Sequence, residues 1–97
     1  NWKVKKIVVK PYQSLSLQMH QYRTEHWTVL KGEATVEING KTFKLKKNQS
    51  TYIPLKSKHR LFNDQGSPLL IVEVQCGDIV KESDIVRFED KYGRLEV

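Results

Sequence analysis

The sequence is poor in the residues that build disulfide frameworks and membrane spans. Its one cysteine, Cys76, cannot form an internal disulfide bond, so we expect a reducing, cytoplasmic compartment. No apolar run is long enough for a signal peptide or a membrane-spanning helix, so no contact with a membrane is expected. Because Cys76 follows the apolar segment LLIVEVQ, we expect a small buried residue there rather than a catalytic thiol.

Acidic residues are also few, with 11 Asp and Glu against 17 Lys and Arg, which gives a formal net charge of +6. Residues 1–76 carry 13 basic and 5 acidic side chains, or +8, whereas residues 77–97 carry 4 basic and 6 acidic ones, or −2. A positive field attracts the phosphate groups of a metabolite or a nucleic acid. The lysines stand singly or in pairs, without a basic helix or regular aromatic interleaving. We therefore expect a solvated surface rather than nucleic-acid binding.

Most apolar segments are short and alternate with polar residues, which is the period-two pattern of half-buried β-strands. The strands predicted in this way cover residues 2–9, 14–19, 25–30, 34–38, 41–45, 50–53, 59–63 and 69–75. Eight short strands with short connections predict an all-β closed barrel or sandwich. A chain of 97 residues suits one domain, so we expect a single domain over 1–97 whose barrel ends at residue 76.

Two features define the ends of these elements. Asn39 and Gly40 lie between ATVEI and KTFKL, and this pair readily adopts the positive backbone angles of a two-residue hairpin turn. The turn predicts that Val36 lies opposite Phe43. Residues 77–97 are charged and lack alternation, so they predict a short helix or an extended arm across the barrel.

Strand parity sorts the candidates for metal ligation. In the strand that begins at Ser14, polar residues share one face and apolar residues the other: Ser14, Ser16, Gln18 and His20 against Leu15, Leu17 and Met19. Burying the apolar face is the simpler arrangement for this strand alone. An inward polar face requires a metal or a wet pocket, because each unpaired polar group in a dry core costs a few kcal/mol. The apolar face would then need a cover, which a second sheet or a second subunit would provide, and we expect a homodimer.

Two other strands favour the inward polar face. Glu25 shares a row with Trp27 and Val29, and a carboxylate on a core-facing row needs a partner, for which a cation is the simplest choice. His26 points the other way and is excluded as a ligand. A lone histidine such as His59 is more often a hydrogen-bonded core residue, but beside the other polar residues it becomes a candidate ligand.

The spacing of these residues resembles the two motifs of the cupin superfamily. In the first, Gly, two histidines, Glu and Gly stand at fixed intervals, matched here by Tyr12, Gln18, His20, Glu25 and Gly32. The second, Pro-x-Gly-x-x-His-x-x-x-Asn, resembles PLKSKHRLFN, with Lys56 at the glycine and His59 at the histidine. The resemblance implies a double-stranded β-helix, or jelly-roll barrel, with one divalent metal ion bound by Gln18, His20, Glu25 and His59.

Longer segments of the sequence point to one family within the cupin superfamily. Four segments are similar to the C-terminal domain of type II phosphomannose isomerases, a domain that is often fused to a mannose-1-phosphate guanylyltransferase of GDP-mannose biosynthesis. These segments are LSLQMHQYRTEHWTVLKGEATV, NQSTYIPLKSKHRL, IVEVQCGD and ESDIVRFEDKYGR. Tyr22 stands where the family usually has His, and Tyr12 and Lys56 stand where the cupin motifs have Gly. None of the three is a presumed ligand. The chain has no glycine-rich nucleotide loop, so it is either a fragment of a longer protein or a free-standing cupin.

This resemblance implies metal-dependent isomerisation of mannose 6-phosphate and fructose 6-phosphate. Two imidazoles, a carboxylate and an amide oxygen suit zinc, our preferred metal, and also manganese, cobalt or iron(II), and they leave a position open for substrate. Glu73 is our candidate for proton transfer, because a carboxylate within LLIVEVQ should be desolvated. The equal alternative is that Glu73 is a structural partner for a basic side chain.

The phosphate of the substrate needs a cation at the rim of the pocket, for which we expect Arg87, with Arg94 and Lys56 behind it. The alternative for each is an ion pair with the acidic residues of the tail. Ser16 shares the ligand face and could donate a hydrogen bond to a substrate oxygen. Two other functions stay open: a non-catalytic cupin that binds a metal or a sugar or serves as a dimerisation module, and a metal-dependent oxygenase. Gln18 counts against the oxygenase, because iron oxygenases often have more imidazole ligands.

Overall fold

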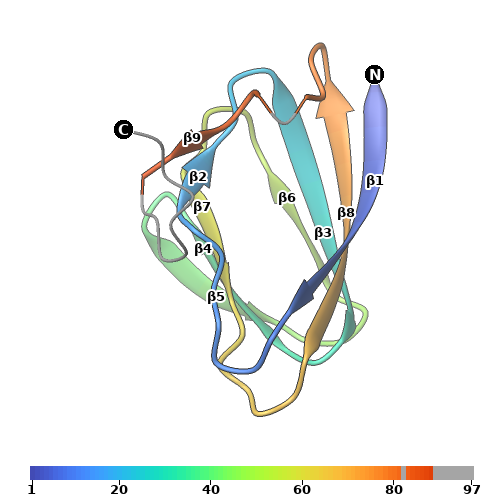
Figure 1. Cartoon of the computed structure of the whole chain (residues 1–97), viewed down its shortest axis with the longest axis vertical. Coiled ribbons are helices and arrows are strands. Elements are labelled where there is room, and N and C mark those ends of the chain that lie inside the picture. Colours follow the sequence, from blue (N-terminus) through green and yellow to red (C-terminus); the bar gives the residue numbers. More distant parts are fainter. Residues whose placement is uncertain (82, 89–97) are drawn as a thin grey trace.

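The computed structural model describes residues 1–81 and 83–88, whose strands form two antiparallel sheets (Figure 1). One sheet has the order β1 (Trp2–Val9), β8 (Leu69–Gly77), β3 (Arg23–Lys31), β6 (Ser50–Ile53). The other has the order β5 (Lys41–Leu45), β4 (Ala34–Ile38), β7 (His59–Phe62), β2 (Gln18–Met19), β9 (Val86–Arg87). No helix in this part of the chain is long and apolar enough to cross a membrane.

The predicted all-β fold is confirmed, and four predicted strands have the observed bounds, namely β1, β4, β5 and β6. The hairpin turn is also confirmed, since Asn39 and Gly40 have φ angles of 49° and 83° and Val36 lies opposite Phe43. The positive angles let the two residues reverse the chain without splaying the strands.

The predicted strand over residues 14–19 is wrong in its extent, because only Gln18–Met19 is a strand. Its first half makes separate backbone contacts instead of a continuous ladder: Ser14 forms an isolated bridge with Phe62, and Leu15 N donates to Leu61 O. The apolar face of this segment, Leu15, Leu17 and Met19, is half-buried, so it is already partly covered within the chain. The homodimer expected from that face stays a prediction.

The tail beyond β8 forms no helix in residues 78–81 and 83–88, where it consists of irregular chain, a turn that Asp84 N closes by donating to Lys81 O, and β9. In Figure 1 this arm crosses one end of the barrel and ends in β9, which pairs with β2. Sequence periodicity did not predict β9, because a two-residue strand has no measurable period.

Inward-facing positions of the long strands form the core. It consists of Val9, Trp27, Val29, Ala34, Val36, Leu45, Ile53, Leu61, Leu69 and Ile71. Burying each such side chain contributes about 1.5–3 kcal/mol before the entropy cost of folding. Along β3, β7 and β8 the inward residues change from apolar to polar towards the end of the barrel that the arm crosses. The buried polar residues there are His20, Arg23, Glu25, His59, Glu73 and Gln75.

Tyr12 and Lys56, which replace glycines of the cupin motifs, keep a backbone conformation typical of glycine. Their φ angles are 59° and 60°, beside 91° at Gly32, the motif glycine that is retained. Non-glycine residues in this left-handed region cost roughly 1–2 kcal/mol each. At these two positions the side chains therefore differ from the cupin motifs, but the backbone conformation is still the one that glycine favours.

Cys76 is exposed, so the expectation of a buried residue was wrong. The alternation of β8 explains it, because buried Gln75 points inward and its neighbour must therefore point outward.

Candidate metal centre

The candidate ligands come from separate strands and meet at the polar end of the barrel. Gln18 on β2 lies directly opposite His59 on β7, and Glu25 lies on β3. The potential ligand atoms of His20, Glu25 and His59 all lie within 4.8 Å of one another. The Nε2 atom of His20 is 3.4 Å from Glu25 Oε2, and that of His59 is 3.5 Å from Glu25 Oε1.

Backbone carbonyls fix both imidazoles in the form that a metal binds. His20 Nδ1 lies 2.5 Å from Asp84 O, and His59 Nδ1 lies 2.9 Å from Ser57 O. A carbonyl oxygen only accepts, so each Nδ1 carries the proton and each Nε2 presents a lone pair towards Glu25. Burial lowers the pKa of both rings, that of His59 to about 4, which keeps them neutral at pH 7.

Glu25 is held among these groups with only 1% of its surface exposed. Desolvation raises its pKa to about 8, and the negative charge of Glu73 adds to this. A divalent cation beside this carboxylate would reverse the effect, because the cation favours the charged form. Two neutral imidazoles and a buried carboxylate therefore fit a divalent metal.

Arg23 belongs to the same cluster, and the sequence analysis missed it. Its guanidinium is buried, with Nε 3.3 Å from Glu25 Oε2 and Nη2 3.2 Å from His20 Nε2. Nη1 donates to the Lys81 carbonyl of the arm at 3.1 Å. The predicted strand began at Glu25. Extending it by two residues would have placed Arg23 on the inward row, so parity was the signal that could have found it.

Gln18 and Ser16 complete the ligand side of a small cavity. Gln18 is half-buried, and its Nε2 donates to Ser16 Oγ at 3.4 Å, which leaves the amide oxygen as its ligand atom. Both residues line a cavity of about 20 Å³ together with Glu25, His59 and Glu73. This volume holds about one water-sized group.

Glu73 lies inward on β8 and reaches the same cavity. Its Oε2 accepts a hydrogen bond from Trp27 Nε1 at 2.9 Å, and its Oε1 accepts one from Gln75 Nε2 at 2.5 Å. Lys5 of β1 lies directly opposite Glu73 in the strand register. The position is therefore compatible with both expectations, proton transfer and a structural role beside a basic residue.

The residues expected to bind phosphate lie at different distances from this cluster. Arg87 is directly opposite Gln18, so both side chains lie on one face of the sheet. Lys56 has an exposed side chain, and its backbone N donates to His20 O at 2.8 Å. Arg94 lies outside the described residues. His26, excluded as a ligand, points outward and contacts the Tyr52 ring.

Two facing antiparallel sheets with a cluster of histidines and a carboxylate at one end give this protein a cupin fold. It is similar in fold to the cupin domain of Cnp3 from Schizosaccharomyces pombe, with a TM-score of 0.77 and 14% identity over 79% of this chain and 56% of that one. At this identity the likeness concerns the fold alone.

The family described as "Mannose-6-phosphate isomerase C-terminal" matches residues 1–90, and the chain belongs to this family. It is 56% identical to the alginate biosynthesis protein AlgA of Pseudomonas aeruginosa over 96% of this chain and 19% of that protein. It is 50% identical to the mannose-1-phosphate guanylyltransferase ManC of Salmonella typhimurium over 97% of this chain and 20% of that protein. The chain thus spans about a fifth of the length of the curated relatives it matches.

Proposed function

We propose that this chain catalyses the metal-dependent isomerisation of mannose 6-phosphate and fructose 6-phosphate and serves the synthesis of sugar nucleotides. The observation that carries the proposal is the buried cluster of His20, Glu25 and His59, in which a carbonyl fixes each imidazole with Nε2 towards the carboxylate. Membership of a mannose-6-phosphate isomerase family supports the choice of substrate.

His20, Glu25, His59 and Gln18 are the residues that would hold a divalent ion, for which zinc is our preference over manganese, cobalt or iron(II). When bound, the ion supplies Lewis acidity to an oxygen on the first two carbons of the sugar. Ser16 lies beside Gln18 and could donate to a substrate oxygen.

In the reaction a proton leaves C2 of the aldose and is returned to C1, while the hydroxyl proton passes from O2 to O1. We assign the carbon-to-carbon transfer to Glu73, because Trp27 and Gln75 hold its carboxylate at the wall of the cavity. We assign the phosphate group to Arg87, with Lys56 and Arg94 as further cations at the rim.

An isomerase assay on zinc-loaded protein tests the proposal, with ¹³C NMR following mannose 6-phosphate labelled at C1 and C2. We expect fructose 6-phosphate to form with wild type and to be undetectable with Glu73→Gln. Glu33→Gln serves as a matched control on a half-buried glutamate of the β3–β4 turn, which pairs with Lys44. A Glu73→Gln variant that is folded and fully active would remove Glu73 from the mechanism.

A second candidate function is that of a non-catalytic module that binds a metal or a sugar. The observation that favours it is that both carboxylate oxygens of Glu73 already accept hydrogen bonds. Titration with mannose 6-phosphate distinguishes the two, because binding that shifts protein resonances without any conversion, at every metal tested, supports the module and contradicts the enzyme.

A further inference from the structure

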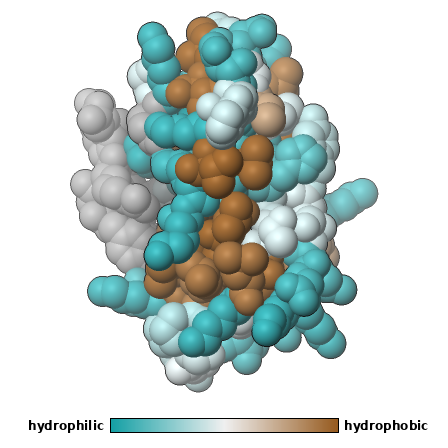
Figure 2. Space-filling model, turned by 90° about the vertical axis from the view of Figure 1, so that its right-hand side faces the viewer, coloured by the Kyte–Doolittle hydropathy of each residue, from teal (hydrophilic) through white to brown (hydrophobic). Residues whose placement is uncertain are grey.

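The two sheets have outer faces of different chemistry. On the sheet that contains β4 and β7, polar interactions occupy outward side chains. Arg60 Nη2 donates to Glu37 Oε1 at 3.0 Å, and Thr35 Oγ1 donates to Asp64 Oδ2 at 2.8 Å. On the sheet that contains β1 and β8, the outward side chains are mainly apolar, and Figure 2 shows a band of hydrophobic surface flanked by hydrophilic groups.

We call the outward residues of this sheet the outer face, and they are the even-numbered positions of β1, β8, β3 and β6. Among them Lys6 is the one Lys, Arg, Asp or Glu. Trp2, Val4 and Val8 are 74%, 54% and 57% exposed, and Tyr52 of β6 is 49% exposed. A contiguous apolar surface of this kind marks a contact surface, whereas scattered apolar residues do not.

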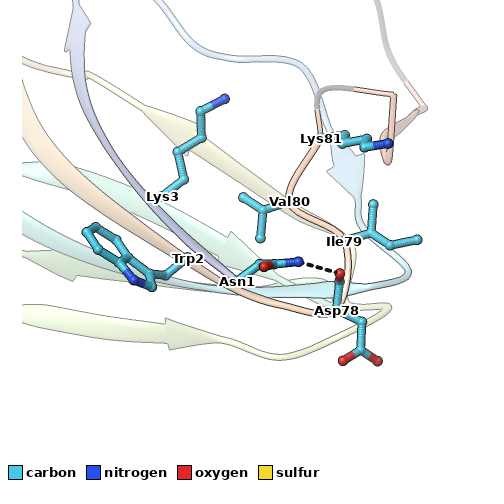
Figure 3. A pocket seen from close by; sticks show the side chains of 7 residues that line it. All are labelled: Asn1, Trp2, Lys3, Asp78, Ile79, Val80 and Lys81. Carbon is cyan, nitrogen blue, oxygen red and sulfur yellow. Dashed lines mark hydrogen bonds between the residues drawn. The ribbon is translucent and has the colours of Figure 1, made fainter.

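Trp2 stands at the edge of the outer face, where the rest of the chain leaves it uncovered. In Figure 3 its indole and the side chain of Lys3 extend to different sides of β1. A hollow of about 900 Å³ lies between the beginning of β1 and residues 78–81 of the arm, so these residues do not cover the indole. Tryptophan is among the residues that most often anchor protein interfaces.

The outer face is large enough for a stable dimer. Its strands contain 8, 9, 9 and 4 residues, and at roughly 3.3 Å per residue and 4.8 Å between strands they cover about 475 Å². Two copies face to face therefore cover about 950 Å² in projection, and protruding side chains such as Trp2 add to the accessible surface that is lost. Specific interfaces bury more than about 1,000 Å² in total.

Charge and symmetry favour a second copy as the occupant. A face with one lysine and no carboxylate offers little to a partner of opposite charge, whereas depletion of charge is typical of the core of a homodimer interface. A twofold axis along the strands, between β8 and β3, places β1 of each copy over β6 of the other. Lys6 and Ser50 belong to one row across the sheet, so Lys6 then lies over Ser50 and the two lysines stay apart.

We propose that the outer face of β1, β8, β3 and β6 packs against the same face of a second copy, so that the two sheets form a sandwich about a twofold axis. Aligned sheets of this kind pack about 10 Å apart. The interface is a different surface from the face of Leu15, Leu17 and Met19. It contains none of the residues assigned to the metal centre, so it stands independently of the isomerase proposal.

Sedimentation equilibrium over a range of protein concentrations tests the proposal. We expect wild type to dimerise and Trp2→Ser to raise the dissociation constant by about tenfold, because one indole is lost from each side. His26→Glu should also raise it by at least about tenfold, since it places two carboxylates in the apolar contact. Leu55→Ser is the matched control, because Leu55 is an exposed apolar residue of the β6–β7 turn, and it should leave the dissociation constant unchanged.

Trp2 and His26 are both exposed in the single chain, so neither variant should lower the melting temperature of the monomer. Wild type that stays monomeric at millimolar concentration would overturn the proposal, and so would a dimer that neither variant weakens. A dimer that Leu17→Ser dissociates and Trp2→Ser does not would place the contact on the other apolar face, which also overturns it.

Cys76 reports on the same contact without a substitution in the outer face. Its thiol is exposed in the single chain and lies directly opposite Trp2 in the strand register. We expect wild type to lose maleimide reactivity as its concentration rises through the dissociation constant, whereas Trp2→Ser should keep it at the same concentrations. Full reactivity of Cys76 in a protein that has dimerised would show that the outer face stays open and would contradict the proposal.

Discussion

At the scale of single residues, the candidate centre depends on hydrogen bonds that orient side chains more than on the side chains alone. The carbonyls of Asp84 and Ser57 set the tautomers of His20 and His59. Partners of this kind typically change metal affinity by about 10–100-fold when removed. Parity predicted which residues face inward, but it could not predict which carbonyl reaches which ring, because Asp84 is 64 residues away from His20 in the chain.

Arg23 gives a prediction at this scale. Its guanidinium lies against Glu25 Oε2 and His20 Nε2, the same atoms that a metal would need. Because a buried positive charge opposes a second cation, Arg23→Gln is expected to raise zinc affinity by about tenfold, or 1.4 kcal/mol, and to lower the melting temperature of the metal-free protein. Isothermal titration and thermal denaturation with and without zinc measure both effects.

Arg60→Gln is the control for Arg23→Gln, because its guanidinium pairs with Glu37 at 3.0 Å. This variant should leave zinc affinity unchanged. Weaker zinc binding by Arg23→Gln than by wild type would show that Arg23 supports the ligands instead of competing with the ion.

Lys56 gives a second prediction. With a φ angle of 60°, it occupies a conformation that glycine adopts without strain. Lys56→Gly is expected to stabilise the fold by roughly 0.5–1 kcal/mol, since relief of strain exceeds the added entropy of the unfolded chain. Lys47→Gly, an exposed turn lysine outside the positive-φ set, should destabilise it. Urea denaturation of both variants checks this, and equal destabilisation would argue against strain at Lys56.

At the scale of elements, the sequence predicted the strands and the turn that depend on residues close together in the chain. Alternation placed β1, β4, β5 and β6, and the Asn39-Gly40 turn set the register of a hairpin. Alternation did not predict the structure of residues 14–17 or of β9. There, backbone hydrogen bonds join segments far apart in the chain, such as the bond from Phe88 N to Leu17 O. Pairings of that kind have no local signature in a single sequence.

The arm is the element whose role can be tested most simply. The carboxylate of Asp84 accepts hydrogen bonds from the backbone N–H groups of Gln21 and Tyr22, both at 3.0 Å, and its carbonyl contacts His20. Asp84→Ala is expected to release the arm, to destabilise the fold by about 1–3 kcal/mol and to weaken zinc binding through His20. Hydrogen exchange at Gln21 and Tyr22 reports the release, and unchanged protection there would contradict this role.

At the scale of the whole molecule, the barrel separates two kinds of interior. Apolar residues fill one end, and the polar cluster lies at the end that the arm crosses. The sequence predicted this division in outline, because the cupin motifs carry polar residues at spacings that alternate into the barrel. It did not predict Arg23 or the hollow at Trp2, which depend on where the arm and β1 lie in space.

Elemental analysis of purified protein after zinc loading and dialysis tests the central claim most directly. We predict one zinc per chain for wild type and for His26→Ala, since His26 points outward, and loss of most zinc for His20→Ala and for His59→Ala. Equal zinc content in all four proteins, or equal loss in the three variants, would contradict a metal centre at the polar end of the barrel.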